Sequence, residues 1–153
     1  MTRISTARLM SALMLVAAAC TAAPQPQREA PCPFTVPNGG PPPGNTGPAN
    51  FGDGKLWVWV PGGKLYLAPD SDGRLSEKFG WWREVPGTLT IDGHRLDAPA
   101  PWLNASVPDG YGPTGFQATG ITFPTPGCWE ITGHVGSESL TFVVEIARDF
   151  SPP

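Results

Sequence analysis

The stretch CWEITGHVGSESLTFVVEIA, residues 128–147, decides the fold of this chain because apolar and polar side chains alternate along both of its halves. Successive side chains of an extended strand point to opposite faces, so the alternation predicts two strands that are each apolar on one face. The segment Gly-Ser-Glu, residues 136–138, separates the two halves as a short turn. We therefore expect a hairpin with a buried apolar face. Its expected core side chains are Trp129, Ile131, Phe142, Val144 and Ile146.

Short apolar runs recur from residue 51 onward, separated by segments rich in Gly, Pro, Asp and Asn. These further runs are residues 55–60, 64–68, 78–85, 88–96, 102–107 and 116–123. None of them has the periodicity of a capped amphipathic helix. Roughly seven to nine short strands in about 100 residues predict an all-β, immunoglobulin-like antiparallel β-sandwich. An up-and-down or jelly-roll barrel is the structural alternative.

Local turn signals predict two more hairpins. Runs 55–60 and 64–68 flank the sequence Pro-Gly-Gly, residues 61–63. Within residues 88–96, the dipeptide Asp92-Gly93 has the composition of a favoured two-residue hairpin turn. We therefore expect each of these segments to fold back on itself within one sheet.

The sequence PGCW, residues 126–129, resembles the start of the last hairpin of immunoglobulin-like sandwiches, where the motif PGxW opens a strand that brings a bulky residue inward. Together with the motifs GWW, RLDAPAP, GYG and PGCWEITG, it is similar to bacterial secreted and lipid-anchored proteins over residues 54–147. The resemblance implies an immunoglobulin-like fold and no activity.

Residues 1–19 have the organisation of a secretory signal peptide, with two arginines, no acidic residue and then the apolar run 9–19. This run is shorter than the about 20 apolar residues of a membrane-spanning helix. The alanines before Cys20 are similar to a bacterial lipobox, with Ala17 in a place where leucine is preferred. We predict a lipid on Cys20 and an extracytoplasmic protein anchored to the membrane. Ordinary cleavage near residue 19 or 23, followed by secretion, is the alternative.

A tether is predicted between the lipid and the domain. Residues 20–50 are rich in Pro, Gly, Ala, Gln and Asn and lack periodic apolar residues, which is typical of a spacer. The strand-bearing domain is predicted over residues 51–150, where the aromatic and branched residues concentrate.

The cysteine count predicts one disulfide. The chain has 3 cysteines, and an odd number in an exported protein calls for an explanation. Assigning Cys20 to the lipid leaves Cys32 and Cys128 as a pair in an oxidising compartment, where a disulfide persists.

Composition and motifs argue against several functions. The formal net charge is −3 and no basic run is present, which disfavours nucleic-acid binding. Cys128, Glu130 and His134 share the polar face of one strand, but the cysteine and histidine lie roughly 20 Å apart along it, too far to share a metal ion or act as nucleophile and base. No hydrolase or phosphate-binding motif occurs. We predict no catalytic residue, no metal ligand and no cofactor.

The aromatic residues are the best functional lead. Trp81 and Trp82 are adjacent, so one of them must point away from the core of any strand that contains both. Tyr111 lies in the Gly-rich segment PDGYGPTG, and Trp102 follows a proline. We predict binding residues at Trp82, Tyr111 and Trp102, where exposed rings stack on a ligand.

These observations favour a lipid-anchored cell-envelope protein that displays a non-catalytic binding sandwich. Its partners are the membrane, through Cys20, and an unidentified protein or envelope polymer. A carbohydrate- or solute-binding module is one alternative. A small extracytoplasmic enzyme or enzyme inhibitor is the other, with the loop around Tyr111 as the contact of an inhibitor.

Overall fold

The computed structural model describes residues 31–39, 50–60 and 62–149. The predicted signal peptide (residues 1–19), Cys20 and most of the predicted tether (residues 20–50) lie outside this described part. The described residues form nine strands, so the prediction of an all-β domain of short strands is confirmed. The strands are β1 (Asn50–Gly52), β2 (Leu56–Trp59), β3 (Lys64–Leu67), β4 (Leu75–Arg83), β5 (Leu89–Arg95), β6 (Asn104–Ser106), β7 (Gly115–Phe123), β8 (Gly127–Val135) and β9 (Glu138–Arg148).

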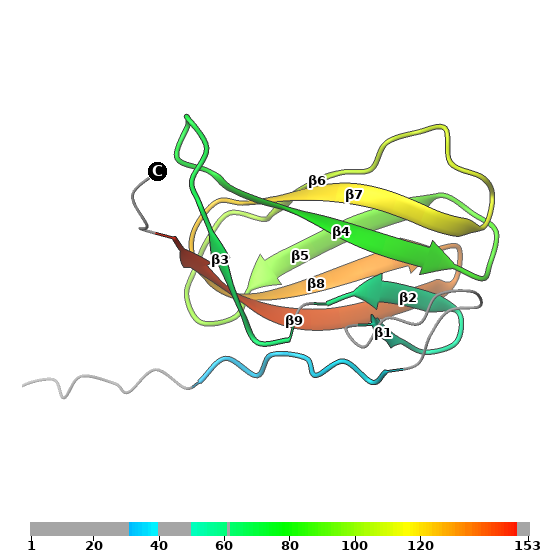
Figure 1. Cartoon of the computed structure of the whole chain (residues 1–153), viewed down its shortest axis with the longest axis horizontal. Helices are drawn as coiled ribbons and strands as arrows, with labels where there is room; N and C mark the ends of the chain where they lie inside the picture. The colour runs from blue at the N-terminus through cyan, green and yellow to red at the C-terminus, as the bar shows by residue number, and fades with distance from the viewer. Residues whose placement is uncertain (1–30, 40–49, 61, 150–153) are drawn as a thin grey trace, which may run out of the picture.

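The strands form two sheets packed face to face, with β4 and β7 in one layer and β8 and β9 in the other (Figure 1). The five-stranded sheet has the order β1-β2-β4-β7-β6, and the four-stranded sheet has the order β3-β9-β8-β5. Paired strands are antiparallel except that β3 runs parallel to β9. The predicted sandwich is therefore confirmed, with a mixed sheet where an antiparallel one was expected.

Strands β8 and β9 form the hairpin predicted from the alternation of residues 128–147. The register runs from Val135 opposite Glu138 at the turn to Gly127 opposite Ile146 at the open end. Gly136 has a φ of 60° in the turn, a conformation that favours glycine. The predicted core side chains are buried between the sheets: Trp129, Ile131, Phe142, Val144 and Ile146.

The predictions of the other two hairpins are wrong. Strand β2 pairs with β1 and β4 in the five-stranded sheet, whereas β3 crosses to the other sheet and pairs with β9. Strand β5 continues through the dipeptide Asp92-Gly93 instead of turning there. Gly93 is needed for packing, because a Cβ at this position would overlap the backbone of β8 and lie 2.5 Å from the Leu103 side chain.

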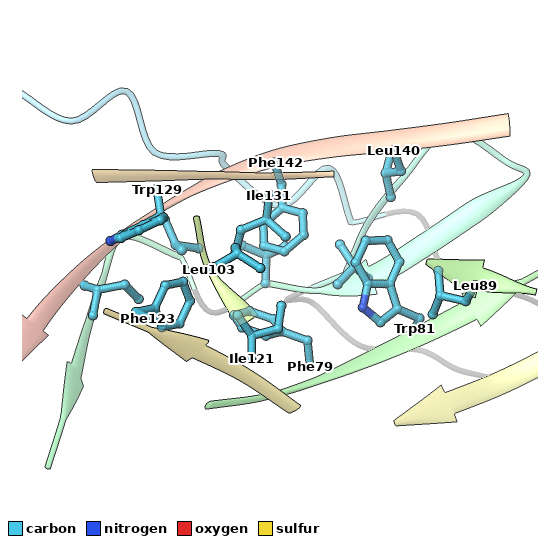
Figure 2. Packing of buried hydrophobic residues seen from close by; sticks show 14 of the residues in the cluster. Phe79, Trp81, Leu89, Leu103, Ile121, Phe123, Trp129, Ile131, Leu140 and Phe142 are labelled. Atoms are coloured by element: carbon cyan, nitrogen blue, oxygen red, sulfur yellow. The ribbon is translucent and has the colours of Figure 1, made fainter. Parts of the chain in front are cut away.

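Aromatic rings fill the space between the sheets (Figure 2). Phe79 and Trp81 project inward from β4, and their ring centroids lie 5.5 and 5.8 Å from that of Phe142 on β9. Phe123 of β7 contacts Trp129 of β8, with centroids 5.6 Å apart. Large buried rings remove much apolar surface from water, so these contacts hold the two sheets together.

A disulfide joins Cys32 to Cys128, in agreement with the prediction, with the two Cα atoms 5.5 Å apart. Cys128 lies at the start of β8, on the polar outer side of that strand, and the bridge buries it to 2% exposure. We call this end of the sandwich, where Phe123 meets Trp129, the disulfide end. The opposite end is where β4 finishes at Arg83 and β8 finishes at Val135.

Residues 31–39 lie against the sandwich beyond the disulfide (Figure 1). The Thr35 N–H donates to the Val143 carbonyl and the Val143 N–H donates to the Thr35 hydroxyl, both at 2.8 Å. Val143 lies on β9 just before the residues that pair with β3. Asn38 Nδ2 then donates to the Gly52 carbonyl of β1 at 2.6 Å. The segment thus covers an open strand edge and links the two sheets.

Replacing Gly133 by alanine is expected to destabilise the fold by about 1–3 kcal/mol through overpacking. A Cβ at Gly133 would overlap the Trp81 indole in the middle of the core. Gly120→Ala is the matched control, because its added Cβ would meet only the Ser106 Cβ at 3.9 Å. Urea denaturation measures both variants, and equal loss of stability would contradict this packing.

Reducing the Cys32–Cys128 disulfide is expected to lower the free energy of unfolding by up to about 4–5 kcal/mol, because the bridge closes a long loop in the unfolded chain. The measurement is urea denaturation with and without a thiol reductant. In a Cys32→Ala/Cys128→Ala variant the reductant should change nothing. A wild-type midpoint that is insensitive to reductant would refute the stabilising role of the bridge.

Candidate functional site

The outer face of the five-stranded sheet carries aromatic side chains that its strand pairing brings into one row. Trp57 of β2 lies opposite Trp82 of β4, and Trp82 lies opposite Phe116 of β7. Directly opposite residues of antiparallel strands point to the same face, so all three side chains are on the outer face. Tyr111, from the loop before β7, meets Phe116 edge to face with centroids 6.5 Å apart. We call Trp57, Trp82, Tyr111 and Phe116 the aromatic cluster.

The cluster is accessible to a ligand. Phe116 is 52% exposed and Tyr111 is 40% exposed, whereas Trp57 and Trp82 are half-buried. The Trp82 indole N–H donates to a Glu84 carboxylate oxygen at 2.5 Å, which fixes the orientation of the ring. The prediction that Trp81 and Trp82 face opposite ways is confirmed, since Trp81 is wholly buried in the core.

Small residues beside the cluster give its rings room. A Cβ added to Gly80 would lie 2.8 Å from Cε2 of Phe116, so this ring extends over β4 and occupies the space above the glycine. The Trp57 ring lies over Gly52 of β1 in the same way. The Phe116 and Trp57 rings therefore extend over the neighbouring strands on the sheet surface, where a ligand can contact them.

The loop that carries Tyr111 is held from the inner side of the sheet. Arg83 is 3% exposed, and its Nη1 and Nη2 donate to the carbonyls of Gly87 and Gly112 at 2.7 and 2.6 Å. Gln117 Nε2 donates to the Pro108 carbonyl at 3.0 Å. Hydrogen bonds from a charged donor are among the stronger ones in proteins, so Arg83 is a firm attachment for the loop. It fixes Tyr111 beside Phe116.

Trp102, the third predicted binding residue, is separate from the cluster. It precedes β6 at the disulfide end, is 68% exposed and lies 5.8 Å from the His94 ring, centroid to centroid. It lines a shallow hollow of about 380 Å³. The other lining residues of this hollow are Arg74, Pro101, Asn104, Thr122 and Pro124. The structure therefore brings Trp82 and Tyr111 together and places Trp102 elsewhere.

Sequence reasoning missed Phe116 and the outward direction of Trp57. The signal for Phe116 was present in the run 116–123, because Phe116 and Phe123 are seven positions apart and must face opposite sides of one strand. For Trp57, the flanking Leu56 and Val58 are the buried residues, and their alternation with Trp57 indicates its outward direction.

The residues Cys128, Glu130 and His134 form no common site. Cys128 is in the disulfide, His134 Nε2 lies 3.1 Å from Asp92, and Glu130 lies 3.9 Å from His94. Among the described residues, no group of three or more His, Cys, Asp or Glu side chains is placed to hold a metal ion. In the same part of the chain, no helix has the length and apolar character needed to cross a membrane.

In each of two charged pairs at the four-stranded sheet, one residue has a displaced pKa. The Arg95 guanidinium donates to Asp97 and holds the pKa of that carboxyl below its usual range. The hydrogen bond to Glu145 raises the pKa of Lys64. Both pairs link residues at or near strand ends, away from the aromatic cluster. We therefore assign them a structural role and no role in binding.

A scan against models of known protein families finds none that matches the chain, and a search of curated proteins finds no relative. The surface chemistry is therefore the basis of a functional proposal.

Proposed function

We propose that this chain is a lipid-anchored, extracytoplasmic protein whose sandwich is a non-catalytic binding module for a carbohydrate polymer of the cell envelope. The observation that carries the proposal is the aromatic cluster: four rings, two of them well exposed, gathered on one sheet face. Such faces match the apolar faces of sugar rings, and rigid aromatic side chains lose little conformational entropy on binding.

The position of the cluster supports a role in display. The segment that leads toward Cys20 reaches the sandwich at Cys32, at the disulfide end and on the outer side of the four-stranded sheet. The cluster lies on the other sheet, toward the end where β4 finishes and β7 begins. In Figure 1 the start of residues 31–39 and the tip of β4 are accordingly at opposite ends of the molecule. The segment that carries the lipid would thus join the domain at the end opposite the cluster.

Removing the lipid site tests the anchoring part of the proposal. Cys20→Ser is expected to move the protein from the membrane fraction to the soluble extracytoplasmic fraction, because stable attachment requires the acyl chains. Fractionation and intact-mass spectrometry measure this change. A wild-type protein of unmodified mass in the membrane fraction would refute lipidation.

Polymer binding is tested with the full chain carrying Cys20→Ser. Pull-down on insoluble peptidoglycan and on neutral cell-wall polysaccharide should retain this protein. Phe116→Ala and Trp82→Ala should each weaken binding roughly tenfold, because losing one stacked ring costs about 0.5–1.5 kcal/mol beyond its lost buried area. Tyr66→Ala is the matched control, since Tyr66 is 66% exposed on β3 of the other sheet. No retention on either polymer, or equal weakening by Tyr66→Ala, would refute the proposal.

A further inference from the structure

Two hollows link Trp102 to the outer face of the five-stranded sheet, which also carries the aromatic cluster. The hollow beside Trp102 is lined by Asn104 and Thr122, which are opposite each other on β6 and β7. A second hollow of about 400 Å³ also includes Thr122 and continues along the same strands. It is lined by Ser76, Glu77, Lys78, Ser106, Gly120, Ile121 and Thr122. Beyond it on the outer face come Gly80 and Ala118, and then Phe116.

We call the surface that runs from Trp102 through the two hollows to Phe116 the path. Its length determines the size of a ligand that contacts both Trp102 and Phe116. Thr122 and Phe116 both belong to β7 and are six residues apart, which corresponds to roughly 20 Å in an extended strand. A single small molecule does not span that distance. A ligand that contacts Trp102 and Phe116 together is therefore an extended chain.

The chemistry of the path favours an uncharged, hydroxyl-rich chain. Ser76 and Thr122 present hydroxyl groups that are 3.0 Å apart, and Asn104 and Ser106 add an amide and a further hydroxyl. The charges are mixed in sign. Lys78 lines the same hollow as Glu77, and Arg74 lies 3.7 Å from Asp72. A surface of balanced charge does not select a polyanion, whereas alternating ring faces and hydroxyl groups suit a polysaccharide.

We propose that Trp102 is a second stacking position for one linear, neutral polysaccharide chain that runs along the outer face of the five-stranded sheet to Phe116. This inference rests on the proposed carbohydrate-binding function and gives the ligand a length, a direction and a charge class. The exposed ring of Trp102 would hold one part of the chain while the cluster holds another, with the hydroxyl groups of the path between them.

The test compares long and short fragments of neutral cell-wall polysaccharide, prepared by partial hydrolysis and size fractionation, by calorimetry with the full chain carrying Cys20→Ser. Wild type should bind long fragments more tightly than short ones. Trp102→Ala should weaken binding of long fragments roughly tenfold, because a ring contact is lost. It should leave short fragments unaffected, since they bind at the cluster. Phe116→Ala should weaken the binding of both long and short fragments.

A second variant guards against an indirect effect of Trp102→Ala. Gly120→Leu places a bulky side chain on the path between the two stacking positions, where an added Cβ would have the Ser106 Cβ as its nearest neighbour, at 3.9 Å. This variant should weaken the binding of long fragments only, and its thermal midpoint should be unchanged. Tyr66→Ala should leave the binding of both long and short fragments unchanged.

The outcomes separate the two proposals. If Phe116→Ala weakens binding while Trp102→Ala binds long fragments as wild type does, the second stacking position is overturned and the cluster remains the binding site. If wild type binds neither length but is retained on peptidoglycan, the neutral chain is overturned and the carbohydrate function stands. If wild type binds neither length and is not retained on peptidoglycan, the carbohydrate function itself is overturned. Affinity should change little as the salt concentration rises, and a steep loss would overturn the assignment to a neutral chain.

Discussion

Trp81 packs against Phe142 and over Gly133 in the middle of the sandwich, and the direction of Trp82 follows from that contact. Adjacent residues of one strand point to opposite faces, so burying the first indole places the second on the outer surface. Pairing with β2 and β7 then aligns Trp57 and Phe116 with Trp82. The arrangement of the candidate binding surface is therefore a consequence of how the core is packed.

Arg83 connects the inner and outer sides of the same sheet. Its guanidinium group is buried and attaches two loops through backbone carbonyls, and one of those loops carries Tyr111. The carbonyl oxygens of Gly87 and Gly112 replace part of the hydration that this buried cation loses. The buried arginine thus fixes a side chain on the exposed face without touching it, which reduces the entropy that Tyr111 would lose on binding a ligand.

Local sequence pattern was sufficient to predict the β8–β9 hairpin. It was insufficient to predict the pairing of β3, the role of Gly93 and the full aromatic cluster. The alternation in residues 128–147 predicted the β8–β9 hairpin because those strands are adjacent and joined by a short turn. The sequence Pro-Gly-Gly after β2 marks a turn but does not say which sheet β3 enters, and its partner β9 lies far along the chain. Gly93 has the composition of a turn, yet it serves close packing between strands. Sequence context identified Trp82 and Tyr111 as candidate binding residues. It did not identify Phe116, because strand register determines which side chains lie beside this residue.

The position of the disulfide has a mechanical consequence. If the lipid holds one end of the chain and a polymer holds the cluster, tension enters the domain at Cys32 and passes directly to Cys128 at the start of β8. Cys128 and the aromatic cluster belong to different sheets, so the load then passes through the packed core that joins the two sheets. Without the covalent link the same pull would reach the weaker contacts of Thr35 and Asn38 and could peel residues 31–39 from the edge of the sandwich. Under the proposed function, the covalent link would therefore protect residues 31–39 from a pull between membrane and wall.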